Sequence, residues 1–251
     1  MNAKRISTLI YLLAVIAVAG ALKWHYSTAN VNELRWILAP TAALVQIATG
    51  TGFEFESFAG YMSADRTFLI AAPCAGVNFL IVCFLMLAVR NNCEGRLIRL
   101  PSMLLIAYGW TVIANAARIA IALHSAGAED LGDAEERHRI EGIIVYFAFL
   151  IGLYMVANKF GRPLTGARSG RIVISALLPL LAYYAVALGV PLLDGSYAAA
   201  KIDHFISVLL VPLLVWIPFA LLAYALAAKE SDRKASPDQS DRKASPDQAA
   251  E

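Results

Sequence analysis

Long runs of apolar residues recur along this chain and constrain its fold more than any other feature. Runs of about 18 residues or more match the length that an α-helix needs to cross roughly 30 Å of hydrocarbon. The chain has 251 residues, of which 59% are hydrophobic and 16% charged, so it is more apolar than a soluble domain. The sequence predicts an all-α polytopic membrane protein with about six transmembrane helices, near residues 7–25, 68–90, 100–124, 139–160, 172–192 and 205–228.

Two segments between the first and second predicted helices are of a different kind. Residues 34–50 are apolar but short, begin beside Arg35 and contain Pro40, which favours a re-entrant or interfacial helix. Residues 53–70 combine alternating phenylalanines with turn residues. A short β-hairpin on the outer membrane surface and an irregular interfacial loop fit this second segment equally well.

Charged residues in the connections predict the orientation in the membrane. Lys4 and Arg5 precede the first helix, and residues 91–99 and 160–171 are rich in arginine, whereas residues 125–137 are acidic. Since basic connections stay on the cytoplasmic side, the amino terminus and the tail should be cytoplasmic. This path requires that residues 34–50 do not cross fully, and it places outside the connections 26–67, 125–137 and 193–204.

The last 21 residues differ from the rest of the chain. The sequence SDRKASPDQ occurs twice in tandem, at 231–239 and 240–248, and is polar and proline-containing. We therefore expect a single integral membrane domain over 1–230 and a disordered cytoplasmic tail over 231–251. The net charge of +2 gives no indication of nucleic-acid binding, because the charges are confined to loops and the tail.

Three consecutive helices carry one reactive or polar residue each near the predicted outer surface. Cys74 lies near the start of the second helix, and Arg118 lies about 9 Å before the outer end of the third. His138 stands at the mouth of the fourth. Although far apart in sequence, these residues share one membrane depth, so the topology predicts that they meet.

A thiol, a guanidinium and an imidazole together suit nucleophilic catalysis. A nearby cation favours the thiolate, which is the reactive form of cysteine. Arg118 could stabilise this thiolate or the oxyanion formed when a carbonyl is attacked. His138 could take the proton from Cys74 and return it to a departing amine.

Further residues near this trio have supporting roles in this interpretation. Gly76 and Gly142 would let a substrate backbone approach closely, and Asn78 and Asn115 would orient their neighbours by hydrogen bonds. The other two cysteines have no such role. We interpret Cys83 as a packing residue and Cys93 as a loop thiol, and the three cysteines show no metal-binding or disulfide spacing.

The motifs PCAG at 73–76, NAAR at 115–118 and HRIEG at 138–142 together resemble the signature of the exosortases and archaeosortases. These are multi-spanning membrane cysteine enzymes with Cys, Asn-x-x-Arg and His-x-x-x-Gly elements on consecutive helices. The extended sequence CAGVNFLI is most similar to the exosortase K branch, and the resemblance covers about residues 30–160. Most exosortases have serine after the cysteine, where this chain has Ala75.

The resemblance implies a cysteine protease or transpeptidase of the bacterial inner membrane with its active site facing the periplasm. Its substrate would be an exported protein with a carboxy-terminal sorting signal, made of a short motif, a membrane helix and a basic end. The family roles would fall on Cys74 as nucleophile, Arg118 as stabiliser and His138 as acid and base. An amine acceptor or water would resolve the thioester, without a metal or an organic cofactor.

Two other classes of protein fit parts of the pattern. In a non-catalytic transporter or assembly factor, Arg118 would form a structural pair with Glu141. A metal-dependent membrane hydrolase would use histidines, of which the chain has four, at 25, 124, 138 and 204. No paired histidine spacing supports this second class.

Overall fold

The fold is a bundle of long helices with a small sheet at one end. The computed structural model describes residues 3–91, 97–125, 134–160, 177–185, 206, 208–218 and 220–221. Four helices form the bundle: α1 (Ala3–Thr28), α3 (Val77–Asn91), α4 (Leu100–Ser125) and α5 (Ala134–Phe160), and the 3-10 segment before α3 extends it to the 19-residue apolar segment Ala72–Arg90. The short 3-10 segments η1 (Ala72–Ala75) and η3 (Leu97–Arg99) precede α3 and α4.

Four segments of the described chain are long and apolar enough to cross a membrane. They are Arg5–Thr28, Ala72–Arg90, Leu97–Ser125 and Ile140–Asn158, and they correspond to the first four predicted helices. The predicted count of six is not confirmed. Residues 177–185 and 208–218 are helical, but the remainder of the predicted helices 172–192 and 205–228 lies outside the described residues, as do Cys93 and the tail 231–251.

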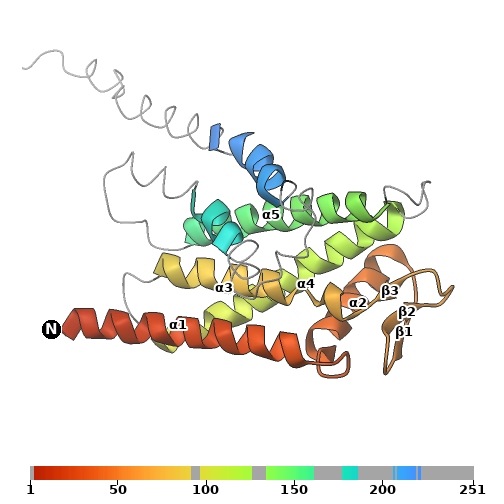
Figure 1. The fold of residues 1–251 in the computed structure, drawn as a ribbon, viewed down its shortest axis with the longest axis horizontal. Helices are drawn as coiled ribbons and strands as arrows, with labels where there is room; N and C mark the ends of the chain where they lie inside the picture. Colours follow the sequence, from red (N-terminus) through yellow and green to blue (C-terminus); the bar gives the residue numbers. More distant parts are fainter. Residues whose placement is uncertain are drawn as a thin grey trace, which may run out of the picture.

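The helices alternate in direction along the long axis of the molecule (Figure 1). The chain runs along α1 away from the amino terminus, returns along α3, goes out again along α4 and returns along α5. The end of α1, the start of α3, the end of α4 and the start of α5 therefore lie at the same end of the bundle. This is the arrangement that brings the predicted site residues to one depth.

The helix α2 (Arg35–Thr49) is a short helix at that same end. Its 15 residues give a length of about 22 Å, less than the roughly 30 Å of a bilayer core. One face of α2 is buried and packs on α4, η1 and the sheet. Gly50 ends the helix in the left-handed conformation, with φ of 75°.

The segment after α2 forms a three-stranded antiparallel sheet, so of the two alternatives for residues 53–70 the hairpin is the one observed, extended by one strand. The strands β1 (Phe53–Glu56), β2 (Gly60–Ser63) and β3 (Leu69–Ile70) pair in chain order, with Phe55 opposite Tyr61 and Tyr61 opposite Ile70. The helix predicted to begin at residue 68 begins later, because residues 69 and 70 belong to β3. The strand β3 leads directly into η1, which carries Cys74.

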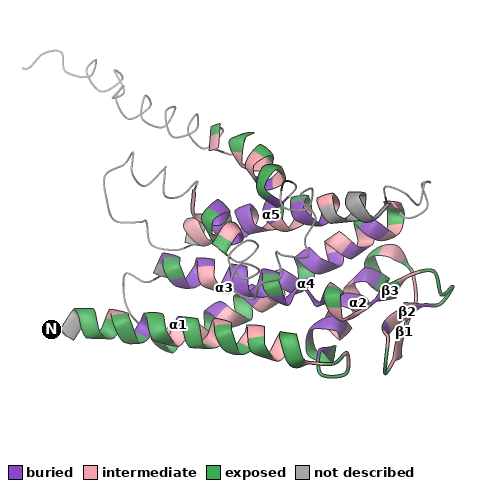
Figure 2. Cartoon of the chain, viewed as in Figure 1, coloured by how far each residue is buried: buried purple, intermediate pink, exposed green. Residues whose placement is uncertain are grey.

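Burial is uneven among the four long helices (Figure 2). The helix α3 packs on α1, α4 and α5. In the segment Ala72–Arg90, which contains α3, 67% of an apolar 18-residue stretch is buried inside the protein, against 11% of the corresponding stretch of α1. Side chains such as Leu13 and Ile16 of α1 are more than half exposed. Since water would not favour so much exposed apolar surface on one helix, α1 has the surface of a lipid-facing helix.

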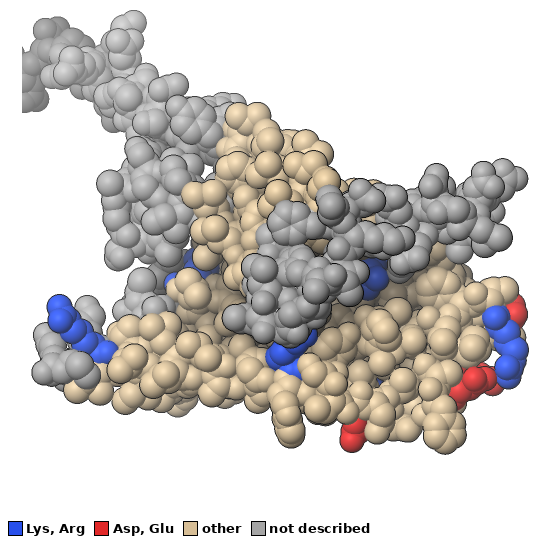
Figure 3. Space-filling view, viewed as in Figure 1, with Lys and Arg blue, Asp and Glu red and all other residues tan. Residues whose placement is uncertain are grey.

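The distribution of charge agrees with this assignment. On the face drawn in Figure 3, most of the surface between the two ends of the bundle carries neither Lys, Arg, Asp nor Glu. The sheet end carries both signs of charge, including the ion pair between Arg66 and Glu56 at 3.2 Å. Only isolated basic groups interrupt the described surface between the two ends, and a largely uncharged surface is what a bilayer requires.

The close approach of β2 and β3 at Gly60 leads to a prediction about the stability of the protein. Gly60 has φ of 133°, and a Cβ there would lie 2.3 Å from the carbonyl oxygen of Ile70. We expect Gly60→Ala to lower the free energy of unfolding by about 2 kcal/mol, because it combines backbone strain with a clash against β3. The measurement is thermal unfolding of the purified protein in detergent.

The matched control is Gly20→Ala in α1, where a Cβ meets nothing within 4 Å. Alanine is favoured over glycine inside a helix, so this variant should be as stable as the unmodified chain or slightly more so. If Gly60→Ala unfolds at the same temperature as the unmodified protein, the close approach of β2 and β3 is wrong.

Candidate functional site

Cys74 lies on a tight turn between the sheet and α3, and the sequence PCAG explains its shape. Pro73 stands in the first turn of η1, where its fixed φ suits a helical start. Gly76 ends η1 with φ of 70°, a conformation that favours glycine. Cys74 is partly exposed on this turn, whereas Cys83 is fully buried in α3, as predicted for a packing residue.

Asn115 of α4 connects that turn to the bundle. Its side-chain Nδ2 donates a hydrogen bond of 2.5 Å to the backbone carbonyl of Cys74. Asn115 is fully buried, so this hydrogen bond is shielded from water. The contact fixes the cysteine-bearing backbone against the helix that also carries Arg118, one turn further along α4.

Tyr146 of α5 connects Asn115 with Arg118. Its hydroxyl donates to Asn115 Oδ1 at 2.8 Å and accepts from Arg118 Nη1 at 3.2 Å. The Tyr146 ring stacks on Phe79 of α3, with ring centroids 4.5 Å apart and an angle of 11°. The hydroxyl group is thereby held at one place by both its hydrogen bonds and its ring.

Arg118 lies within the helical part of α4, about 10 Å from its end at Ser125. Its guanidinium carbon stands 5.3 Å from the centroid of the Tyr146 ring, within the range of a cation–π contact. A Cβ at Gly142 would lie only 2.8 Å from Arg118 Nε. The absence of a side chain at position 142 therefore gives room to the arginine.

The two site glycines each stand against polar side chains of the protein itself. Gly76 and Gly142 were expected to admit a substrate backbone. A Cβ added at Gly76 would lie 3.2 Å from both Asn115 Cγ and the Tyr146 hydroxyl. Both glycines leave room for the protein's own polar side chains, and their role in admitting a substrate backbone stays a prediction.

Tyr26 of α1 completes the group of polar side chains at this end. It interacts electrostatically with both Cys74 and Arg118, and Tyr146 interacts electrostatically with Cys74, Arg118 and Tyr26. Cys74, Arg118, Tyr26 and Tyr146 therefore lie within electrostatic range of one another at this end of the bundle, and we call these four residues the polar cluster. The structure brings the predicted Cys74, Arg118 and Asn115 together.

The third predicted catalytic residue, His138, is placed by its backbone only. It lies in the first part of α5, whose side chains up to residue 139 are outside the described part of the chain. Residues 138, 142 and 146 are spaced by four, so they share one face of α5. Gly142 and Tyr146 on that face contact Arg118, which puts position 138 one turn beyond them.

Two other residues from the sequence analysis lie apart from these contacts. Asn78 is exposed in the first turn of α3, and its partner expected from sequence, Cys74, is held by Asn115 instead. The carboxylate of Glu141 accepts a hydrogen bond from Ser125 Oγ at 3.2 Å. Arg118 and Glu141 thus each have another partner in the described structure, Tyr146 and Ser125 respectively.

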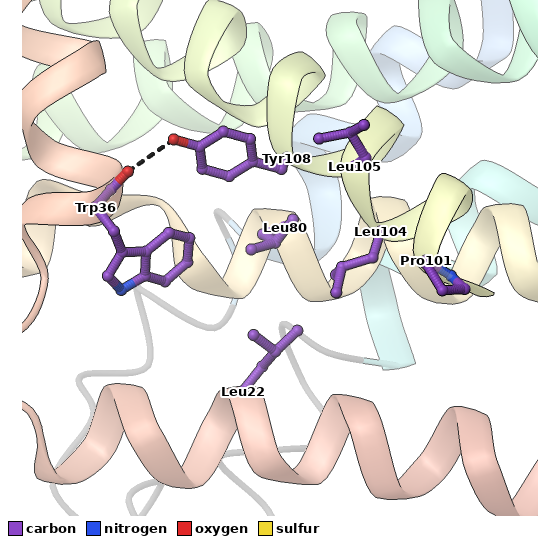
Figure 4. A pocket seen from close by; sticks show the side chains of 7 residues that line it. All are labelled: Leu22, Trp36, Leu80, Pro101, Leu104, Leu105 and Tyr108. Atoms are coloured by element: carbon purple, nitrogen blue, oxygen red, sulfur yellow. Dashed lines mark hydrogen bonds between the residues drawn. The ribbon is translucent and has the colours of Figure 1, made fainter.

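An apolar groove of about 300 Å³ opens on the side of the bundle, between α1 and α4 (Figure 4). Leu22, Leu80 and Leu104 line it from three helices. Trp36 and Tyr108 close one end, with ring centroids 5.7 Å apart and the Tyr108 hydroxyl donating to the Trp36 carbonyl at 2.7 Å. Leu22 stands one turn before Tyr26 on α1, so the groove begins close to the polar cluster.

Among the described residues, no three His, Cys, Asp or Glu side chains are grouped as a metal site. His25 packs near Trp36, with ring centroids 6.4 Å apart, and His124 Nδ1 lies 2.9 Å from the carbonyl of Ala120. His204 is outside the described residues. The polar cluster consists of a thiol, a guanidinium and two phenols, and the Asn115 amide contacts it.

Comparisons with family models, with curated proteins and with solved structures give no match for this chain. The resemblance of its three motifs to exosortases therefore remains a prediction. What bears on function is the geometry of the site itself.

The different burial of the two described cysteines predicts their reactivity. In a Cys93→Ser background, we expect a neutral maleimide to alkylate Cys74 about tenfold faster than Cys83, or more, since Cys74 is partly exposed and Cys83 is fully buried. Mass spectrometry of the digested protein measures both rates. Equal rates in the folded protein, or faster labelling of Cys83, would contradict the position of Cys74 on an open turn.

Proposed function

We propose that this chain is a membrane-embedded cysteine protease or transpeptidase that cleaves carboxy-terminal sorting signals from exported proteins. The observation that supports this most directly is the chain of contacts from Arg118 through Tyr146 and Asn115 to the Cys74 carbonyl. It holds a cation near a partly exposed thiol inside a helical bundle. A charged arginine within an apolar helix is costly, and such residues usually mark a functional site.

The first chemical step forms a thioester. His138 accepts the proton of Cys74, and the thiolate sulfur attacks a substrate peptide carbonyl. Arg118 stabilises the negative charge, first on sulfur and then on the carbonyl oxygen of the tetrahedral intermediate. The carbon–nitrogen bond breaks, the departing amine takes the proton from His138, and the acyl group remains on sulfur.

The second step releases the product. An amine acceptor attacks the thioester carbonyl, which gives a new amide, and the sulfur leaves as the thiol after the amine proton returns to it through His138. Water in place of the amine gives a carboxylic acid instead. Both routes restore the enzyme and need no metal or organic cofactor.

The form of the substrate follows from where the thiol lies. Cys74 stands at the end of a long apolar helix, so a peptide bond next to a substrate's own membrane helix would reach it at the same depth. The apolar groove between α1 and α4 opens sideways, where a helix in the bilayer could contact it. A basic end on the substrate would remain on the cytoplasmic side. In this proposal the cluster faces the periplasm of a bacterial inner membrane.

The test uses tagged exported proteins that have a carboxy-terminal helix and a basic end and are encoded by the same organism as this chain. Each is expressed with the unmodified chain or with Cys74→Ala, and processing is followed by gel shift and mass spectrometry. We expect Cys74→Ala to abolish cleavage, because the nucleophile is lost. Arg118→Ala and His138→Ala should lower it at least about a hundredfold, the size expected for an oxyanion stabiliser or an acid–base group.

Cys83→Ala is the matched control, since it removes a buried thiol from the same helix region. It should retain processing at the unmodified rate if the protein accumulates normally. Cleavage that continues unchanged with Cys74→Ala would rule out the proposed enzyme.

A further inference from the structure

Tyr146 belongs to none of the three sequence motifs, yet it contacts two motif residues, Arg118 and Asn115. It touches Arg118 with both its hydroxyl and its ring face, Asn115 with its hydroxyl and Phe79 with its ring. It comes four residues after Gly142 and eight after His138 on α5. The motif His-x-x-x-Gly therefore continues on the same helix face to a tyrosine.

The hydrogen bonds through Tyr146 all run in one direction. Arg118 donates to the Tyr146 oxygen, Tyr146 donates to Asn115 Oδ1, and Asn115 Nδ2 donates to the Cys74 carbonyl. The Tyr146 hydroxyl and the Asn115 amide each accept a hydrogen bond from the group before them and donate one to the group after them. Such a chain polarises each member toward the next, which strengthens every link of this partly buried network.

We propose that Tyr146 is a positioning residue that couples the guanidinium of Arg118 to the backbone of Cys74. This inference rests on the proposed function. Without the hydroxyl, Arg118 would lose a hydrogen-bond acceptor and Asn115 would lose the donor to its Oδ1. The Asn115 amide that holds the Cys74 turn would then lose one of its two hydrogen bonds, and the guanidinium would be held less firmly relative to the sulfur.

The lengths and packing explain why a tyrosine stands here. Asn115 and Arg118 are three residues apart on one helix, and the hydroxyl of one side chain from α5 reaches both. Stacking on Phe79 fixes the ring, so the hydroxyl position does not depend on its hydrogen bonds alone. Gly76 also lies against this hydroxyl, since a Cβ at position 76 would come within 3.2 Å of it.

The decisive variant is Tyr146→Phe, which keeps the ring and its stacking and removes only the hydroxyl. In proteoliposomes containing a tagged substrate, we expect kcat to fall about tenfold with KM unchanged, as for the loss of a hydrogen bond to a charged group. Alkylation of Cys74 by a neutral maleimide should slow severalfold in the same preparation, because the cation no longer stabilises negative charge on the sulfur. The melting temperature should change little.

Tyr154→Phe is the matched control. Tyr154 lies two turns further along α5, and its buried hydroxyl makes no hydrogen bond among the described residues. Removing that hydroxyl should leave kcat, KM and the alkylation rate of Cys74 unchanged. If Tyr154→Phe lowers these rates as much as Tyr146→Phe, the effect is one of helix packing and the positioning role is wrong.

A double variant tests whether the chain acts as a unit. Asn115→Ala interrupts it at its centre, so Asn115→Ala with Tyr146→Phe should be no slower than Asn115→Ala alone. If Tyr146→Phe does not accumulate in the membrane, kcat and the alkylation rate of Cys74 are measured for Asn115→Ala instead. Multiplicative losses in the double variant, or unmodified rates in Tyr146→Phe, would overturn the proposal.

The two arms of the experiment separate this inference from the proposed function. Alkylation of Cys74 needs no substrate, so it reports on the coupling even if no exported protein is cleaved. Loss of processing in Cys74→Ala together with normal rates in Tyr146→Phe would leave the enzyme intact and remove only the role of Tyr146.

Discussion

The hydrogen bond from Asn115 to the Cys74 carbonyl is the contact on which the arrangement of the site depends. It joins a 3-10 turn, which packing alone would hold weakly, to the most polar stretch of α4. Because Asn115 is fully buried and also accepts from Tyr146, losing one partner would leave a buried polar group unsatisfied. The same contact therefore sets the position of the thiol and commits α4 and α5 to one relative placement.

A half-buried arginine within an apolar helix is energetically costly, and several residues offset this cost for Arg118. Tyr146 accepts a hydrogen bond from the guanidinium and places its ring against it, while Gly142 leaves room for Nε. A larger residue at position 142 would displace the cation, and a phenylalanine at 146 would remove an acceptor. Such arrangements cost stability in an apolar bundle, so their presence is more readily explained by chemistry at the site than by packing.

Sequence patterns predicted the parts of the structure that depend on membrane depth. Hydropathy located the first four helices, and alternation of direction brought Cys74 and Arg118 to one end. The start of the second helix was placed too early, because Leu69 and Ile70 are apolar in a strand as they would be in a helix. Tyr146 was missed since its role depends on a contact between helices. The spacing of residues 138, 142 and 146 on α5 is the one signal that could have indicated it.

The Cys74 thiol and the Arg118 guanidinium lie at the same end of the bundle although they are 44 residues apart in the sequence, and the proposed chemistry needs them within reach of one another. A heterobifunctional reagent with a maleimide at one end, a phenylglyoxal at the other and a short spacer measures this directly. It reacts first with Cys74 and then with whichever arginine lies within reach, and mass spectrometry of the digest identifies the linked pair. The structure predicts a link from Cys74 to Arg118, absent in Arg118→Lys. If Cys74 is linked only to other arginines, or to none, then the Cys74 thiol and the Arg118 guanidinium do not lie within reach of one another, and the account is contradicted.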